Sequence, residues 1–242
     1  MTDTAPPPQT SSETSPGLRG FDYAPPMEPY LDILHEDEDI LVLDKQSGLL
    51  MVPGNRPGLE DCLTARARAH HRHASLVHRL DKDTSGVCIM GLHHRAQRHL
   101  GRQFEKRRLS KLYVARVAGH LRDDSGTVDL PLGTDPDQRP KQKVDHEHGR
   151  SAVTHWQVTA REPATDTLPS GATRLLLRPE TGRSHQIRVH LLALGHPILG
   201  DNFYADDHVL AAAGRLQLHA FALTLRHPTG GTPMSFFAPV PF

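Results

Sequence analysis

The sequence predicts an α+β fold. Segments with the two-residue period of strands and a segment with the four-residue period of a helix follow one another without regular strand–helix–strand alternation. Of the 242 residues, 23% are charged and 37% hydrophobic, which is enough apolar material for a sizeable core. No internal repeat is visible. These observations favour one mixed domain over a bundle or a doubly wound sheet.

The first elements are expected in the apolar stretches before residue 91. Residues 40–43 predict a short strand, and Ser47-Gly48 a turn that leads to a hairpin partner at 49–52. A helix is expected over 59–70. Residues 87–90, which lie between two glycines, predict a buried strand.

The middle of the chain gives the clearest periodicity. Leu92, Ala96, Leu100 and Phe104 recur every fourth residue and predict an amphipathic helix. From Lys111 the period changes to two, which predicts a strand that ends at Gly119.

The remaining elements are expected in the second half. Residues 184–194 predict a helix, with Ser184 able to cap its start and Gly195 its end. Further strands are expected at 151–160, 173–178, 218–226 and 234–238.

Charge is distributed unevenly although the net charge is zero. Residues 1–28 are rich in Pro, Ser and Thr and predict a disordered acidic tail, followed by a single domain at 29–242. Residues 1–40 hold nine acids and one base, so residues 41–242 have 27 bases and 19 acids. The excess is concentrated in residues 95–116, which have one acid, Glu105, among eight bases. Such a cluster suits a phosphate backbone or, equally, a solvated helix face.

Several classes of protein are excluded or disfavoured. No apolar run is long enough to span a membrane, and the N-terminus has no signal-peptide pattern. Two cysteines without metal-ligand or redox spacing favour a reducing, cytoplasmic location. The sequences His70-His71-Arg72-His73 and His146-Glu147-His148 lack the spacing of a closed zinc site, so no metal is expected.

The stretch that begins at Asp81 also resembles the opening of a calcium-binding loop. That loop needs a bidentate acid at its twelfth position, where this chain has Leu92. Calcium is therefore excluded, and Asp81 remains as an acid between Arg79 and Lys82 in a turn before a buried strand. Its charged form is favoured there, so it suits either a structural ion pair or chemistry at neutral pH.

Four motifs in order resemble the RluA family of pseudouridine synthases and cover residues 31–242. They are His78-Arg79-Leu80-Asp81 with Thr84-Ser85-Gly86, Lys111-x-Tyr113-x-Ala115, Gly182-Arg183-x-His185-Gln186-x-Arg188-x-His190, and Gly195-His196-Pro197-Ile198-x-Gly200-Asp201. One departure is Gln46, where the family's hairpin usually has proline.

The resemblance implies a fold and a set of roles. The fold is a central, mixed but mostly antiparallel sheet with flanking helices and an active-site cleft, without an appended S4-type module. Catalytic roles fall on Asp81, on Tyr113, which stacks on the uracil, and on Arg183, which we expect to form a salt bridge with Asp81. Substrate-binding roles fall on Arg79, which holds the flipped base, and on His78, Lys111 and Ile187. Because the reaction is an isomerisation, no cofactor is expected.

The resemblance also implies an RNA partner. Arg139–Val144 and Leu192–Pro197 resemble the dual-specificity members, which modify 23S rRNA and the anticodon stem-loop of certain tRNAs. The expected backbone contacts are Arg102, Arg107, Arg108, Arg139, Lys141 and Lys143, and the protein is expected to be a monomer. The alternatives are a synthase for one RNA class, a non-catalytic RNA-binding protein with this fold, and a glycosidic-bond hydrolase, which would need paired carboxylates.

Overall fold

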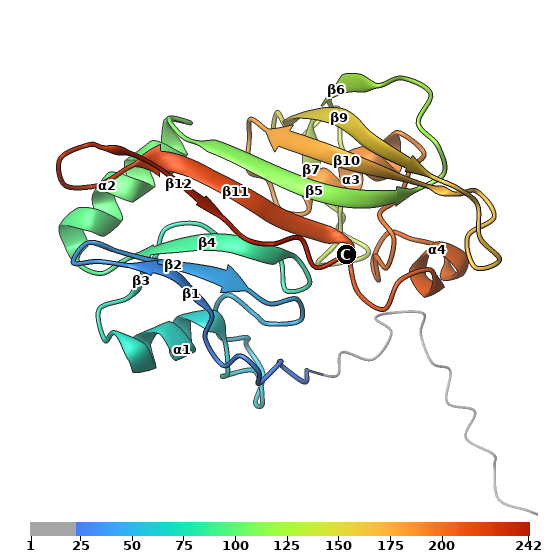
Figure 1. Ribbon diagram of the computed structural model, residues 1–242. Helices are drawn as coiled ribbons and strands as arrows, with labels where there is room; N and C mark the ends of the chain where they lie inside the picture. The colour runs from blue at the N-terminus through green and yellow to red at the C-terminus, as the bar shows by residue number, and fades with distance from the viewer. Residues whose placement is uncertain (1–22) are drawn as a thin grey trace, which may run out of the picture.

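The computed structural model describes residues 23–242 and consists of a long mixed sheet with helices on both faces (Figure 1). The strand order is β1-β2-β4-β11-β5-β10-β9-β6, with β12 beside β11 and β3 beside β4. The main strands of the first half are β1 (Ile33–Glu36), β2 (Ile40–Lys45), β3 (Ser75–Leu76), β4 (Ser85–Gly91), β5 (Ser110–Ala118) and β6 (Ser125–Asp129). Those of the second half are β9 (Val153–Glu162), β10 (Ala172–Pro179), β11 (Leu218–Arg226) and β12 (Pro233–Phe237).

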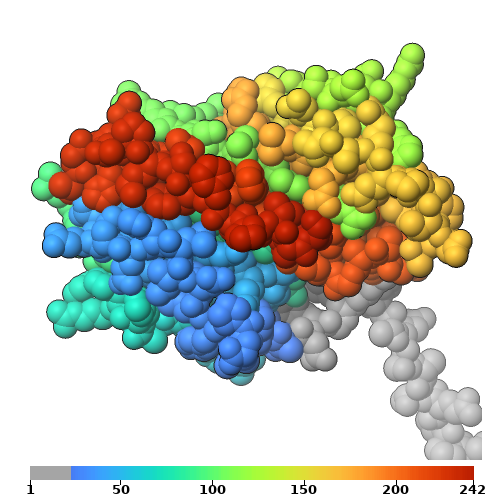
Figure 2. All heavy atoms as spheres, in the orientation of Figure 1, coloured from blue at the N-terminus to red at the C-terminus, as the bar shows by residue number. Residues whose placement is uncertain are grey.

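All pairs in the sheet are antiparallel except β4 with β11. The predicted mixed, mostly antiparallel sheet is thus confirmed. A separate hairpin is formed by β7 (Leu132–Thr134) and β8 (Gln142–Val144). In the view of Figure 2 the C-terminal residues run as a band between the N-terminal part and the part that contains β9 and β10.

Alternation along the strands separates the two faces of the sheet. In β2, Ile40 and Val42 pack with Leu100 of α2 (His94–Glu105), whereas Leu41 and Leu43 pack with Leu63 of α1 (Leu63–His70). The helices α1 and α2 therefore cover opposite faces. The helix α3 (Gln186–Ala193) packs on β5 and β10, and α4 (Asp207–Ala211) is a short helix near the start of β10.

Tyr113 in β5 packs against the clusters beneath both α1 and α3. The face of the sheet that these two helices share therefore also carries the residues around Asp81.

The predicted strands at 40–43, 87–90, 111–117, 151–160, 173–178, 218–226 and 234–238 are present with small changes of boundary. The helix with the Leu92–Phe104 stripe is also confirmed, because Ala96 and Leu100 are fully buried and Arg95, Arg98 and Arg102 are exposed.

The predicted hairpin partner at 49–52 is wrong. Leu49 and Met51 are buried, but their backbone carbonyls do not enter a ladder. The carbonyl of Leu49 accepts from Lys45, and those of Leu50 and Met51 accept from the amides of Leu63 and Thr64. These bonds fix the start of α1 at Leu63, four residues after the predicted start, and β2 pairs with β1 and β4 instead.

The boundary of the predicted tail is also too late. Tyr23 donates its hydroxyl hydrogen to the carbonyl of Asp61, and Arg66 donates to the carbonyls of Pro26 and Tyr30. Residues 23–28, which the sequence assigns to the tail, therefore pack against the domain. The rest of that predicted tail, residues 1–22, lies outside the described residues.

Candidate active site

Asp81 lies in the turn that leads into β4, and backbone contacts fix the shape of this turn. The carbonyl of Lys82 accepts from the amide of Gly48 at 3.0 Å and from the Nζ of Lys45 at 2.7 Å. The Oγ of Ser47 donates to the carbonyl of Asp83. The Ser47-Gly48 turn thus supports the turn of Asp81, and Gln46 in place of the usual proline leaves it intact.

Lys45 is fully buried and serves as the main support. Its Nζ donates to the carbonyls of Gln46, Leu49 and Lys82 at 2.7–2.8 Å. Three acceptors use all three hydrogens of an ammonium group, whereas a neutral amine would satisfy only two of them. Burial lowers the pKa of Lys45 to about 7, and the nearby carboxylates of Asp83 and Asp81 oppose that decrease.

Strand β4 begins directly after the turn and needs glycine at its second residue. Gly86 has φ +112°, and a Cβ at this position would lie 2.3 Å from the carbonyl oxygen of Ala220 in β11. The motif Thr84-Ser85-Gly86 therefore has a physical reason here: the parallel neighbour approaches too closely for a side chain.

The charged partner of Asp81 is Arg188 in α3. The Nη1 of Arg188 lies 3.5 Å from Oδ2 of Asp81, and Nε and Nη2 donate to the two carboxylate oxygens of Asp201 at 2.8 and 2.6 Å. Both Arg188 and Asp201 are almost fully buried, while the side chain of Asp81 is 27% exposed. Burial works against the charge of Arg188, but the bonds to Asp201 and the charge of Asp81 raise its pKa. One guanidinium thus joins a buried carboxylate to an accessible one.

The expected salt bridge from Arg183 to Asp81 is absent. Arg183 lies before α3, and its Nε donates to the carbonyl of Ser151. Ser184 is not the cap either: α3 starts at Gln186, and His185 precedes it with φ 53°. The start of α3 is instead organised by Gln186, whose Oε1 accepts from the amide of Arg183 and the hydroxyl of Thr181. The predicted end is confirmed by Gly195 at φ +82°.

Two aromatic side chains that the sequence did not single out, Phe203 and Tyr204, lie against Arg188, and His185 of the third motif packs on both of them. The rings of Phe203 and Tyr204 lie 5.0 and 5.1 Å from its guanidinium carbon. His185 stacks on Phe203, and its Nδ1 is 2.6 Å from the hydroxyl of Tyr204. The signal in the sequence was the Phe-Tyr pair two residues after Asp201, which means little before Asp201 is known to bind Arg188.

Tyr113 is close enough to Asp81 to be influenced by its charge. Burial raises the pKa of Tyr113, and Asp81 and Cys88 raise it further. Tyr113 is therefore a neutral phenol at pH 7. Ile187, which is expected to bind the substrate, is buried in the apolar cluster against which Tyr113 packs.

His78 and Lys111 are both partly enclosed. The ring of His78 stacks on Phe104, and its Nε2 accepts from the amide of Ile89. Burial, followed by the charge of Lys111, lowers the pKa of His78 to about 3, so it is neutral. The Nζ of Lys111 donates to the carbonyl of Thr181, and burial lowers its pKa to about 8.

The expected RNA-contacting residues lie at the surface. Arg79, Arg102, Arg107, Arg108, Arg139 and Lys143 are exposed, and Lys141 is half-buried with its Nζ bonded to Gln138. Arg139–Lys143 lie on the β7–β8 hairpin, and the amide of Gln142 donates to the hydroxyl of Tyr204. The basic hairpin is thereby connected to the residues around Arg188.

A cavity of about 550 Å³ lies beside the turn, lined by Asp83, Asn202 and Arg215 among others, but not by Asp81. Asp81 itself is open to solvent. Among the described residues no group of three or more His, Cys, Asp or Glu side chains is arranged to hold a metal ion. Within the same part of the chain, no helix is long and apolar enough to cross a membrane.

Comparison with known proteins agrees with this arrangement. The family model described as RNA pseudouridylate synthase matches residues 39–193. The chain belongs to this family, whose RNA pseudouridine synthases are isomerases.

The curated relatives it resembles include the dual-specificity RNA pseudouridine synthases RluA of Escherichia coli (strain K12) and Haemophilus influenzae. The first is 50% identical over 220 residues, which is 91% of this chain and 98% of the relative. The second is 46% identical over 218 residues, or 90% and 97%.

A solved structure with the same fold is human RNA pseudouridylate synthase domain containing 1. Its TM-score is 0.72 at 29% identity, with 88% of this chain and 84% of that chain covered.

Proposed function

We propose that this protein isomerises uridine to pseudouridine in RNA and that Asp81 starts the reaction. The observation that carries the proposal is the geometry of Asp81: an accessible carboxylate beside the one guanidinium nitrogen of Arg188 that Asp201 does not use. The family and the fold support the same chemistry.

The reaction must break the N1–C1′ bond of uridine, turn the base, and join C5 to C1′. The base has to leave the RNA stack first, which costs a few kcal/mol and least in an irregular loop. Arg79 is exposed and forms no ion pair with a carboxylate within residues 23–242, which suits a role in holding the flipped nucleotide. Asp81 then either attacks C1′ or removes a proton from C2′.

Tyr113 is proposed to stack on the uracil. A neutral phenol suits this contact because it adds no charge next to Asp81 and can still donate a hydrogen bond. It must lose its own proton before it can accept the proton that leaves C5.

A hydrolase of the glycosidic bond is less well supported. Such an enzyme needs two free carboxyl groups on either side of the bond. Asp201 is buried against Arg188, and Asp83 accepts a hydrogen bond from Asn202 at 3.2 Å. Neither resembles a free second carboxylate opposite Asp81.

The proposed substrates are 23S rRNA and the anticodon stem-loop of tRNA, by analogy with the dual-specificity relatives. We further propose that the protein acts as a monomer in the cytoplasm and that RNA lies along α2 and the β7–β8 hairpin.

The test is release of tritium from RNA labelled at C5 of uridine, with an anticodon stem-loop and a large-subunit rRNA fragment as substrates. Tritiated water from both RNAs supports a dual-specificity synthase, and release from one restricts the substrate. Free uracil in place of tritiated water would support the hydrolase, and binding without either product would support the non-catalytic protein.

A further inference from the structure

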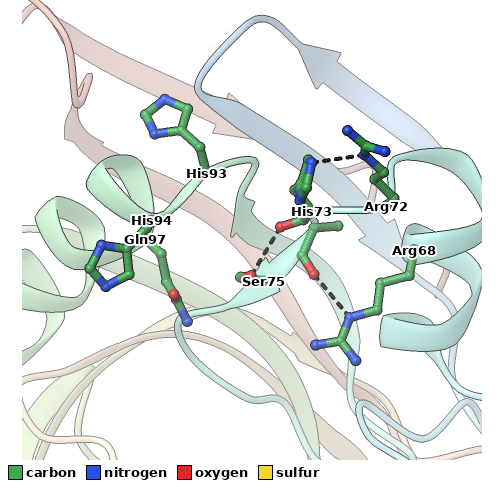
Figure 3. A pocket seen from close by; sticks show the side chains of 8 residues that line it. Arg68, Arg72, His73, Ser75, His93, His94 and Gln97 are labelled. Atoms are coloured by element: carbon green, nitrogen blue, oxygen red, sulfur yellow. Dashed lines mark hydrogen bonds between the residues drawn. The ribbon is translucent and has the colours of Figure 1, made fainter.

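A basic cavity lies beside the end of β4 that is farther from Asp81. It is a cavity of about 450 Å³ between the C-terminal end of α1 and the N-terminal end of α2 (Figure 3). Its charged and polar lining is made by Arg68, Arg72, His73, Ser75, His93, His94 and Gln97. Figure 3 shows Arg68 and Arg72 on one side of the hollow and His94 and Gln97 on the other.

The charges of the two arginines in this cavity are not neutralised within the described part of the chain, whereas His93 is paired with Asp39 at 2.5 Å. Arg68 uses only its Nε, which donates to the carbonyl of Ala74, and Arg72 uses only its Nε, which donates to Nε2 of His73. No ion pair of either arginine with a carboxylate is found among residues 23–242. Four terminal guanidinium nitrogens are thus available for an anion.

The start of helix α2, which borders the cavity, also favours an anion there. The first turn of α2 has no acidic residue, and Arg95 adds positive charge where the helix dipole is already positive. The amide of Ala96 donates to Nδ1 of His93, which caps the helix. An anion beside this helix end would offset the charge of Arg95 and of the helix dipole. A bound phosphate would satisfy both the helix end and the two arginines.

We propose that this cavity, the α1–α2 pocket, binds a backbone phosphate of the substrate RNA at a distance from the target uridine. The inference rests on the proposed RNA substrate. An RNA strand is favoured over a free anion because α2 connects the pocket to the active-site rim. Its exposed arginines Arg95, Arg98 and Arg102 lie between His94 and Arg107, and the charge of Arg107 influences Lys111.

The dimensions suit one stem-loop. The seven residues of β4 separate the pocket from Asp81, which corresponds to about 23 Å. Each strand of double-stranded DNA advances about 3.4 Å per phosphate, and A-form RNA has a spacing of the same order, so the contacted phosphate would lie on the order of seven nucleotides from the target. The pocket would therefore contact the stem and not the loop.

The test compares Arg68→Gln, Arg72→Gln and the double variant with the wild type on two RNAs. One is a long stem-loop, and the other keeps the loop but has its stem cut to about three base pairs. Arg122→Gln is the control, because it removes the same charge from an exposed residue in the loop between β5 and β6. Equal melting temperatures show that the variants fold.

We expect the double variant to raise KM for the long RNA by about 5- to 20-fold with kcat close to that of the wild type. The slope of the logarithm of its RNA-binding constant against the logarithm of salt concentration should become shallower by about 1, since one phosphate contact is lost. On the short RNA the KM values of the double variant and the wild type should agree within about twofold. Arg122→Gln should have the KM of the wild type on both RNAs.

Equal losses on the long and short RNAs would overturn the proposal, as would no loss on either or a decrease in kcat alone. The proposal would also be overturned if the double variant bound both RNAs as tightly as the wild type while inorganic phosphate stabilised only the wild type. That result would identify a site for a free anion. If the wild type releases no tritium at all, the proposed function fails, while the binding comparison still decides the pocket.

Discussion

Arg188 divides its guanidinium between two carboxylates with different environments. Asp201 takes Nε and Nη2 and is buried, so it fixes the plane of the group, whereas Asp81 faces Nη1 and solvent. Phe203 and Tyr204 lie close to the same guanidinium. Arginine is required here because lysine offers one point charge where the site uses a planar fork.

The assignment of Arg188 in place of Arg183 can be tested directly. Arg188→Lys keeps the charge but cannot bind both carboxylates, so kcat should fall by at least about 100-fold. Arg183→Lys, the matched change on the neighbouring loop, should keep kcat within about threefold because Arg183 contacts only a backbone carbonyl. Tritium release at saturating RNA measures both, and the opposite ranking would contradict the assignment.

The elements that carry the site are held by close backbone approaches, and β4 is the clearest case. Every residue of β4 is buried, and its parallel partner β11 pairs with it through Ser85 and Gly86. The turn of Asp81 thus depends on a close approach between β4 and β11 that only glycine at position 86 permits.

Gly86→Ala should therefore destabilise the protein by about 2–4 kcal/mol, because a Cβ would collide with the carbonyl of Ala220 and φ is positive. Gly101→Ala is the matched control: it lies inside α2, a Cβ there meets nothing within 4 Å, and the change should stabilise by about 0.5–1 kcal/mol. Urea unfolding measures both. Equal effects of the two substitutions would contradict this account of β4.

Much of the fold at the element scale could be predicted from periodicity. The strands with long apolar runs and the Leu92–Phe104 helix were found because their burial follows a simple period. The apolar residues 49–52 predict a strand wrongly, because their side chains are buried as in a strand while their carbonyls accept from α1 and Lys45. The short elements β3, β7, β8 and α4 carry too few residues to show a period.

The site could be predicted only to the level of its motifs. Asp81 and Tyr113 lie near one another, as the motifs imply. The choice between Arg183 and Arg188 depends on where α3 starts, and that start is set by the hydrogen bonds of Gln186 with Thr181 and Arg183. Such a local arrangement leaves no period or spacing in the sequence.

Across the whole molecule, buried neutral histidines link stability to pH. Burial lowers the pKa of His78 to about 3 and lowers the pKa values of His190 and His219 as well. The unfolded chain binds protons at these histidines below about pH 6.5, whereas the folded protein binds them only at lower pH. The stability they contribute is therefore present above pH 6.5 and is lost as the pH falls toward their folded values.

We accordingly expect the free energy of unfolding to decrease below pH 6.5 by up to about 1.4 kcal/mol per pH unit for each such histidine. His78→Gln should have a shallower decrease between pH 6.5 and 4 than the wild type, whatever its stability at pH 7. His146→Gln, on an exposed turn, should follow the wild type. Parallel curves for His78→Gln and the wild type would show that His78 is not the buried neutral group described.

The most direct test of the central claim is C5-tritium release by the wild type and by Asp81→Asn, with RNA binding measured for both. Asparagine has nearly the same shape but is a poor nucleophile and base, so we expect full binding and release reduced by at least about 1000-fold. Release by Asp81→Asn at a rate near that of the wild type would contradict the account, because the reaction would then start at another group.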